Sequence, residues 1–404
     1  MFTRSAYLNQ IHPFMDKPVI KVIVGMRRVG KSTILEQLRN YLTKVQKIRS
    51  ANIVYINKES LDFDDLKTYL DLHKYVQKEL AHAKGKRYIF IDEIQEIEDW
   101  EKAISSFLAE KLGDIIITGS NAQMLSSELA TKLTGRYIEF PIWPLSFKEF
   151  LQFRGIKTPL KDYTEEFKLY LQFGGLPGIH SFKLDEEPEA TASYLNSILN
   201  TILLKDIVRR YKIRDVTHLE RITTFLLDNC GNIISAKSIA DYFRSQRIKL
   251  SVDTVQSYLE YLCHARLAHR VKRFDIKGKR LLEFYDKFYL GDLGLRSAIP
   301  GINTGDWHGI LENVVYLELL RRGYQVSIGG IDGLEIDFIA QKAQKRLYIQ
   351  VAYLLDSKKA IQREFGNLQK INDNFPKLVL SMDTLNHGHE GIEHQNMIQF
   401  LLER

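Results

Sequence analysis

The sequence is poor in the features that mark secreted, membrane-bound or fibrous proteins. It has 2 cysteines in 404 residues, Cys230 and Cys263, and neither has other candidate metal ligands around it at a regular spacing. We therefore expect both to be core thiols in a reducing compartment. No apolar run approaches the length that crosses a bilayer, and the first residues lack the apolar stretch of a secretory leader. The sequence predicts a cytoplasmic protein that makes no contact with a membrane.

Internal repeats, low-complexity tracts and Pro/Gly/Ser linkers are also missing, so domain borders must be inferred from changes in pattern. The chain is long enough for two or three domains. Its hydrophobic share of 45% and its charged share of 26% are typical of globular proteins. The patterns predict four parts, namely alternating strands and helices, a helical lid or connector, a group of short helices with a hairpin, and a final α/β part, over 1–143, 144–215, 216–292 and 293–404.

The most informative motif is the segment 25–33, which reads Gly-Met-Arg-Arg-Val-Gly-Lys-Ser-Thr. Gly25 and Gly30, separated by four residues and followed by lysine and a hydroxyl residue, form the P-loop pattern. The apolar, β-branched run Val19–Val24 precedes the loop, and a helical pattern begins at Ser32. A loop between a strand and a helix places backbone N–H groups and the positive end of a helix dipole around a phosphate. We expect nucleotide phosphates to be bound by Gly25, Arg28, Val29, Gly30, Lys31, Ser32 and Thr33.

Four side chains are expected to perform the chemistry of such a site. Lys31 would reach the β- and γ-phosphates, and the Ser32 hydroxyl would hold Mg²⁺. A second motif follows the apolar strand predicted over 88–91, where Asp92 and Glu93 stand side by side. Asp92 is expected to bind the magnesium through water, and Glu93 to orient and deprotonate the attacking water. Because binding alone needs only the first acid, the pair predicts hydrolysis.

Two further positions are less specific. The predicted strand 114–118 is followed by Ser120 and Asn121, which either sense the γ-phosphate or belong to a turn that caps a helix. Arg136 enters the fifth predicted strand, 137–140, and we expect it on the side of the sheet where the phosphates bind. An arginine there can stabilise transition-state charge in its own subunit or in a neighbouring one, and the alternative is a surface arginine.

These elements, in this order, resemble the AAA-type P-loop ATPases of the additional-strand catalytic-Glu division. Several details narrow the resemblance. The loop has paired arginines at 27–28, the acidic motif reads Ile-Asp-Glu-Ile-Gln at 91–95, and the next strand ends in Ile-Thr-Gly-Ser-Asn at 117–121. Two later segments are Phe-Pro-Ile-Trp-Pro-Leu-Ser-Phe-Lys-Glu-Phe at 140–150 and Gly-Gly-Leu-Pro at 174–177. The set is similar to predicted prokaryotic AAA-type ATPases fused to a C-terminal domain of unknown function, over essentially the whole chain. The resemblance implies the fold, ATP with Mg²⁺, and a bacterial or archaeal cytoplasm.

The part over 216–292 predicts a winged helix-turn-helix. Three helical stripes are followed by two extended runs, 267–273 and 280–288, around a turn at 277–279. The segment 244–280 holds ten Lys/Arg against three acidic residues, an excess equal to the +7 net charge of the whole chain. Such a segment attracts the phosphates of duplex DNA. The third helix exposes no arginine suited to reading guanine, so we expect backbone contact, with a protein–protein module as the alternative.

The last part, 293–404, predicts a helix, three strands, a helix and a strand, an order that resembles the restriction-endonuclease-like core. An active version offers a helix Glu, a strand Asp and an acid-x-Lys pair, gathered on a divalent metal. Glu312 and Asp337 fit the first two positions. Gln350 and Ala352 stand where the second acid and the lysine are expected. The sequence therefore predicts a degenerate nuclease-like site at Glu312, Asp337 and Gln350.

Neighbouring residues could replace the missing acid and lysine only in part. A glutamine such as Gln350 stands in for the acid in some sites of this kind, and Lys358 or Lys359 is near enough in sequence to swing in. The adjacent pair Arg363–Glu364 is expected to be a structural ion pair on a helix. We expect this domain to bind a partner or hold an assembly together, and not to cut.

The leading hypothesis from the sequence is an ATP-hydrolysing switch or motor that drives or gates an interaction with DNA or a protein partner. A homo-oligomer follows if Arg136 acts on a neighbouring subunit. The first alternative is a slow nucleotide-dependent regulatory or defence switch, or a scaffold. The second is an ATP-gated nuclease, which would depend on Asp337.

Overall fold

The computed structural model describes residues 2–120, 133, 135–156, 162–281, 286–302 and 307–403. The chain forms two compact units, Met1–Ile142 and Trp143–Arg404. The change of pattern expected after residue 143 falls at the border between these units. The borders expected at 215 and 292 fall inside the second unit, which is a single compact body.

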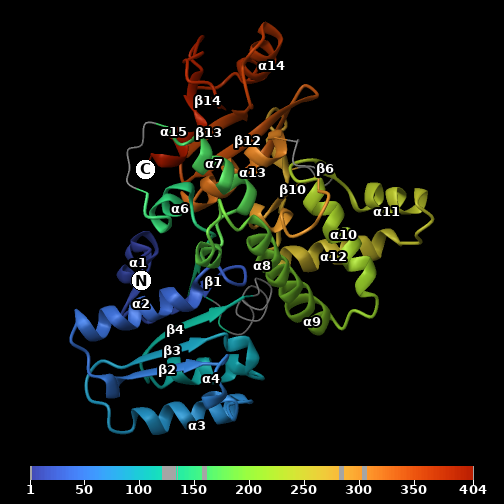
Figure 1. Cartoon of the computed structure of the whole chain (residues 1–404). Helices are drawn as coiled ribbons and strands as arrows, with labels where there is room; N and C mark the ends of the chain where they lie inside the picture. Colours follow the sequence, from blue (N-terminus) through green and yellow to red (C-terminus); the bar gives the residue numbers. More distant parts are fainter. Residues whose placement is uncertain are drawn as a thin grey trace. The chain divides into compact units, whose positions relative to one another are not determined.

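The first unit is built on a five-stranded parallel sheet (Figure 1). The strands β1 to β5 span Ile20–Val24, Ile53–Asn57, Tyr88–Asp92, Asp114–Gly119 and Tyr137–Pro141. Their order in the sheet is β2-β3-β4-β1-β5. The strand β4 thus lies between β1, which leads into the P-loop, and β3, which ends in the two acids. The runs of apolar residues in β1, β3 and β4 are buried throughout, as in parallel sheets covered on both faces.

Helices cover both faces of this sheet (Figure 1). On one side lie α1 and α2, and on the other α3 and α4, over Ser5–Ile11, Lys31–Lys44, Tyr69–Leu80 and Trp100–Ala109. Leu72 and Val76 of α3 and Ile104 and Phe107 of α4 share one apolar core with alternate strand residues. The α/β architecture expected from the sequence is confirmed for this unit.

The second unit begins with helices. The helices α6, α7 and α8 span Phe147–Phe153, Thr164–Phe173 and Pro188–Thr201, and α8 continues through a π-helical turn, Ile202–Val208, into α9, Arg209–Tyr211. Three more follow, α10, α11 and α12, over Val216–Asp228, Ala236–Ser245 and Val252–His264. Beside them lies an antiparallel sheet of order β6-β10-β7, over Ile233–Ile234, Asp286–Leu290 and Ala268–Val271.

The expected hairpin forms, and the part near its turn also joins the next sheet. The strands that flank its turn, β8 (Arg273–Asp275) and β9 (Arg280–Leu281), pair with each other, but β8 also pairs in parallel with β11 of the next sheet, where Arg273 lies opposite Ile328. The preceding strand β7 pairs with β10 on the other side of the turn, as a hairpin requires. Pairing with β11 satisfies backbone groups that a free hairpin edge would leave to solvent. The expected border at 292 therefore crosses a continuous structure.

The last sheet has seven strands in the order β15-β14-β13-β12-β11-β8-β9 within the described residues. Its strands β11 to β15 span Gln325–Ile331, Leu334–Lys342, Lys345–Val351, Lys377–Ser381 and Glu393–Asn396, and its helices α13, α14 and α15 span Trp307–Arg321, Lys358–Gln369 and Met397–Leu402. The helix, three strands, helix and strand expected over 293–404 occur in that order, and β15 and α15 extend them. Helix α13 is buried along most of its length, which fits its apolar composition all round.

The Gly-Gly pair of the 174–177 segment is explained by a buried carboxylate in the second unit. Gly174 has φ +73°, and a Cβ there would lie 2.0 Å from Asp292 Oδ1. Asp292 accepts hydrogen bonds from the N–H groups of Gly175 (2.7 Å) and Gly294 (2.9 Å). Burial nevertheless raises the pKa of Asp292 to about 7. The motif therefore joins two segments of the chain that are distant in sequence.

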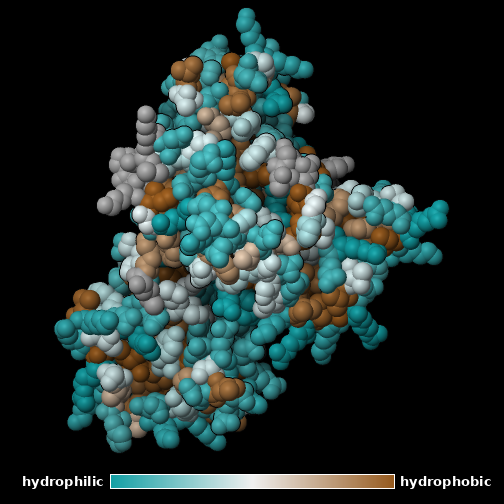
Figure 2. All heavy atoms as spheres, viewed as in Figure 1, coloured by the Kyte–Doolittle hydropathy of each residue, from teal (hydrophilic) through white to brown (hydrophobic). Residues whose placement is uncertain are grey.

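The outer surface of the face shown in Figure 2 is mainly hydrophilic, with hydrophobic residues in small separate groups. The most exposed large apolar side chains, Leu61, Leu385 and Val45, come from different elements. Among the residues that the structure describes, no helix is both long and apolar enough to cross a membrane.

Candidate functional site

The P-loop follows β1 at the carboxyl edge of the parallel sheet and leads into α2. Gly30 has φ +97°, which strongly favours glycine. A Cβ on Gly25 would lie 2.5 Å from the carbonyl oxygen of Ile142 and 2.9 Å from a methyl of Val29. Because α2 begins at Lys31, the N–H groups of its first turn have no acceptor within the helix and remain available at the loop. The structure brings all seven expected phosphate-binding residues together at this point.

Lys31, Asp92 and Glu93 converge beside the loop. The Lys31 ammonium lies 3.4 Å from Glu93 Oε1, and all three side chains are buried. Asp92 Oδ2 is buried and accepts no well-formed hydrogen bond from the described residues, and the Ser32 hydroxyl lies close by. An unsatisfied buried carboxylate oxygen next to a hydroxyl suits a hydrated magnesium ion, whose ligands are oxygen atoms. The residues present therefore fit Mg²⁺ bound with a nucleotide.

A network of hydrogen bonds holds the two acids in place. The Thr118 hydroxyl donates to Asp92 Oδ1, and its oxygen accepts the Glu93 N–H at 2.9 Å. Gln95 donates to the Glu93 carboxylate and, at 3.4 Å, to Ser120 Oγ. Glu93 has φ +53°, a strained backbone for a residue with a side chain, as often occurs at functional sites. Ser120 is thus linked to Glu93 by the two hydrogen bonds that Gln95 donates.

The sequence did not single out Thr118 and Gln95, although both lie inside the motifs described above. The signal that could have identified them is the adjacency of β3 and β4, because neighbouring parallel strands end at the same edge. Asn121, the other expected sensing residue, lies outside the described residues.

The charges around the two acids shift their pKa values in opposite directions. Burial raises the pKa of Asp92 above its ordinary value, although the hydrogen bond from Thr118 and the nearby Ser32 hydroxyl act in the opposite direction. Burial alone would also raise the pKa of Glu93, but the Lys31 ammonium, with Gln95 and Arg27, holds it below its ordinary value. Glu93 is therefore ionised at neutral pH, as an acceptor of a proton from water must be.

The structure corrects the expected place of Arg136. The strands β5 and β1 run parallel with Tyr137 opposite Ile20, and the Arg136 carbonyl accepts the Ile20 N–H at 2.8 Å. Arg136 therefore lies at the amino edge of the sheet, whereas the P-loop follows Val24 at the carboxyl edge. The strand between them is about 13 Å long, at about 3.3 Å per residue. The prediction that Arg136 lies on the phosphate side is wrong, and a role in its own subunit's site is excluded by this geometry.

At the amino edge Arg136 lines an open hollow of about 640 Å³. Four other basic residues line it as well, namely Lys17, Lys86, Arg87 and Lys111. A role for Arg136 in a neighbouring subunit stays a prediction.

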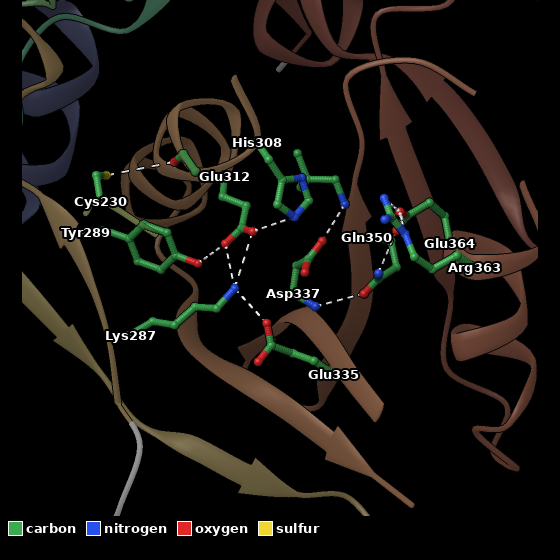
Figure 3. Close-up of polar contacts among 12 residues, drawn as sticks. Cys230, Lys287, Tyr289, His308, Glu312, Glu335, Asp337, Gln350, Arg363 and Glu364 are labelled. Carbon is green, nitrogen blue, oxygen red and sulfur yellow. Dashed lines mark hydrogen bonds and ion pairs between the residues drawn. The ribbon is translucent and has the colours of Figure 1, made fainter. Parts of the chain in front are cut away.

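A second polar cluster is buried in the second unit, around Glu312 of α13 (Figure 3). Its carboxylate is 3.0 Å and 3.3 Å from the Lys287 ammonium, 3.1 Å from His308 Nε2, and accepts the Tyr289 hydroxyl. Lys287 also pairs with Glu335 at 2.7 Å. Sequence reasoning missed Lys287 and His308, because β10 and the start of α13 meet only in the folded chain.

Asp337 and Gln350 lie on neighbouring strands of the same region (Figure 3). Asp337 accepts the Val351 N–H through Oδ2, and its own N–H donates to Gln350 Oε1, both at 2.8 Å. The amide of Gln350 donates to Glu364 at 2.8 Å, and Glu364 also pairs with Arg363 at 2.6 Å. The expected Arg363–Glu364 pair is present, and it is tied to the site through Gln350.

The cluster also shifts pKa values. The hydrogen bond with Glu312 raises the pKa of His308 to about 9. Burial, with the Glu312 charge nearby, raises the pKa of Asp337 well above its ordinary value. Burial would raise the pKa of Glu312 as well, but His308 and Lys287 hold it below its ordinary value. Glu312 is therefore the carboxylate that these cations keep ionised.

Comparisons with known proteins agree with the first unit's geometry. Residues 17–151 match a family described as an AAA domain, and residues 164–306 match a domain of unknown function (DUF8612). An uncharacterized protein of Haemophilus influenzae is 38% identical over 404 residues, which cover 100% of this chain and 99% of that protein. The uncharacterized protein MJ1544 of Methanocaldococcus jannaschii is 31% identical over 388 residues, which cover 93% and 83%. The chain belongs to the family of these two proteins.

The AAA domain of this chain has the fold of P-loop ATPases. The Walker-type ATPase PABY2304 of Pyrococcus abyssi superposes with a TM-score of 0.50 and 14% identity, covering 74% of this chain and 95% of that one. At this identity the likeness shows the fold alone. The P-loop, the parallel sheet and the AAA match together establish a P-loop protein of the AAA type.

Proposed function

We propose that this AAA-family protein binds ATP with Mg²⁺ and hydrolyses it, and that hydrolysis gates an interaction of residues 143–404 with a partner. The observation that carries the proposal is the buried Glu93 carboxylate, ionised and 3.4 Å from the P-loop lysine. A protein that only bound nucleotide would gain nothing from a strained, buried second acid at this position.

The chain's own residues suggest how binding prepares the base. Bound ATP with Mg²⁺ supplies the phosphoryl group and an ion that neutralises its charge. Ser32 and Asp92 would hold the ion, and the N–H groups at the start of α2 would hold the phosphates. The phosphates compete with Glu93 for Lys31, and Glu93 becomes more basic as Lys31 turns away. Gln95 keeps the freed carboxylate in place, since it donates to it independently of Lys31.

Thr118→Val is expected to lower the rate of ATP hydrolysis about tenfold, roughly 1.4 kcal/mol in the barrier. The change removes the hydroxyl that accepts the Glu93 N–H and donates to Asp92, so both acids lose a fixed orientation. Steady-state phosphate release measures the rate, and a fluorescent ATP analogue measures binding. Thr118→Ser keeps the hydroxyl and serves as the matched control. Equal rates in wild type and Thr118→Val would show that this network does not position the acids.

The partner we propose is duplex DNA, bound through the basic segment 244–280. Several of its basic side chains are exposed, namely Arg247, Lys249, Lys272, Lys279 and Arg280. Three others are paired with acids outside the segment, Arg244 with Asp241, Arg270 with Asp286 and Lys277 with Asp332, which reduces the charge available to phosphates. The helices α10 to α12 with β7 and β10 support a winged-helix arrangement for this contact.

We expect duplex DNA to raise the ATP hydrolysis rate several-fold, and the effect to fall steeply with salt because phosphate contacts release counterions. The double variant Arg247→Glu/Lys249→Glu should lose this stimulation while keeping the rate without DNA. The matched control is Lys237→Glu, an exposed charge reversal on α11 outside the segment. A rate indifferent to DNA would contradict this partner and favour a protein partner.

A further inference from the structure

Three side chains with metal-binding atoms meet in the polar cluster of the second unit (Figure 3). His308 Nε2 and one carboxylate oxygen each of Glu312 and Asp337 lie within 4.8 Å of one another. His308 and Glu312 are one helical turn apart on α13, and Asp337 comes from β12. Ligands of one ion, each about 2.0–2.2 Å from it, lie at most about 4.4 Å apart, and these three groups gather at close to that spacing.

One of these ligand groups is incompletely satisfied. Asp337 is 4% exposed, and its Oδ2 accepts the Val351 N–H. Its other oxygen, Oδ1, accepts no hydrogen bond within the described part of the chain. Figure 3 shows this carboxylate beside the His308 ring. Because no donor among the described residues occupies this oxygen, it is available to a bound cation.

The charges around the cluster also call for a cation. Glu312, Asp337, Glu335 and Glu364 contribute carboxylates, whereas the cationic side chains in direct contact with them are Lys287, Arg363 and the half-exposed His308. Lys287 contacts Glu312 and Glu335, and Arg363 contacts Glu364. Neither of these two makes a contact with Asp337 in the described structure. A buried carboxyl group without a paired charge keeps its proton, so a metal ion is what would allow Asp337 to ionise.

We propose that His308, Glu312 and Asp337 bind a divalent transition-metal ion, and Mn²⁺ serves as the probe of the site. Mg²⁺ and Ca²⁺ prefer oxygen ligands only, whereas a site with one imidazole nitrogen and two carboxylates suits a divalent transition-metal ion. Gln350 is not a ligand in this arrangement. It fixes the Asp337 backbone and holds Glu364 away from the ion, so it is a positioning residue. The site differs in its ligands from the degenerate one expected from the sequence, and it requires no cleavage activity.

The test is Mn²⁺ binding by the full-length protein without nucleotide, followed by the loss of the free-ion EPR signal. All proteins carry Asp92→Asn, so that the nucleotide site lacks the carboxylate expected to hold its ion. We expect a single Mn²⁺ per chain in this background, with the affinity lowered at least tenfold by His308→Ala and by Asp337→Asn. The matched control is Asp356→Asn, an exposed carboxylate outside the cluster, which should change nothing.

His308 is half-exposed, so His308→Ala should fold as the parent does, and circular dichroism with thermal unfolding checks this. Mn²⁺ should raise the unfolding temperature of the parent and not of the His308→Ala variant. Excess Mg²⁺ should fail to displace Mn²⁺. Absence of binding at millimolar Mn²⁺, or binding of equal strength in parent, His308→Ala and Asp337→Asn, would overturn the proposal.

Discussion

Glu93→Gln is expected to lower the rate of ATP hydrolysis by at least about 10²-fold, the usual contribution of a general base, and to leave ATP binding intact. The variant keeps the shape of the side chain and the contact with Gln95, but it removes the charge that accepts a proton. It also removes the negative partner of Lys31, which should make the lysine more available to phosphates. ATP affinity is therefore expected to stay equal or rise.

The measurement combines steady-state phosphate release with equilibrium binding of a labelled nucleotide. Glu96→Gln is the control, because Glu96 is an exposed acid three residues further on the same segment. A Glu93→Gln protein that hydrolyses ATP at the wild-type rate would show that another group accepts the proton. Loss of binding in this variant would mean that Glu93 is needed for the shape of the loop and not for chemistry.

Lys31→Ala is expected to weaken ATP binding by about 10²-fold, since it removes a charged donor to the phosphates, worth about 1.5–3 kcal/mol. The structure adds a second effect on the protein without nucleotide. Lys31 forms an ion pair with the buried Glu93, and removing one partner of a buried pair costs about 3–5 kcal/mol because the other charge loses its partner. The variant should therefore unfold at lower denaturant concentration even when no ATP is present.

A double-mutant cycle separates these two effects. Lys31→Ala/Glu93→Gln should regain much of the stability that Lys31→Ala loses, because the unpaired carboxylate is gone, while ATP binding stays weak. Lys44→Ala, an exposed change on the same helix, is the control. Additive losses of stability in the double variant would mean that the two side chains do not interact.

Much of the AAA domain could be predicted from the sequence because its signals are local. An apolar strand, a glycine loop and a helix follow one another over fifteen residues or so, and Asp92 and Glu93 end another apolar run. Each such segment carries its own periodicity and its own stop signals, so β1, β3 and α2 form where the patterns place them. The pairing of the strands then brings the two motifs to one edge of the sheet.

The errors and omissions arose where position depends on contacts between distant segments. Arg136 precedes β5, which runs parallel to β1. Because the P-loop follows β1, a residue that precedes β5 lies at the opposite edge of the sheet. The expected hairpin forms, but its strand β8 also pairs with β11, a partner that no local pattern indicates. Lys287 and His308 carry no motif, and they become part of a polar cluster only because β10 packs beside α13.

The most direct test of the account is hydrolysis of prebound ATP in a single turnover, started by Mg²⁺, in wild type and Glu93→Gln. The account predicts that wild type releases phosphate within the reaction time, and that the variant retains ATP bound and uncleaved with at least about 10²-fold slower release. Equal single-turnover rates in the two proteins would contradict the assignment of Glu93 as the base, and with it the proposed ATP hydrolysis at this site.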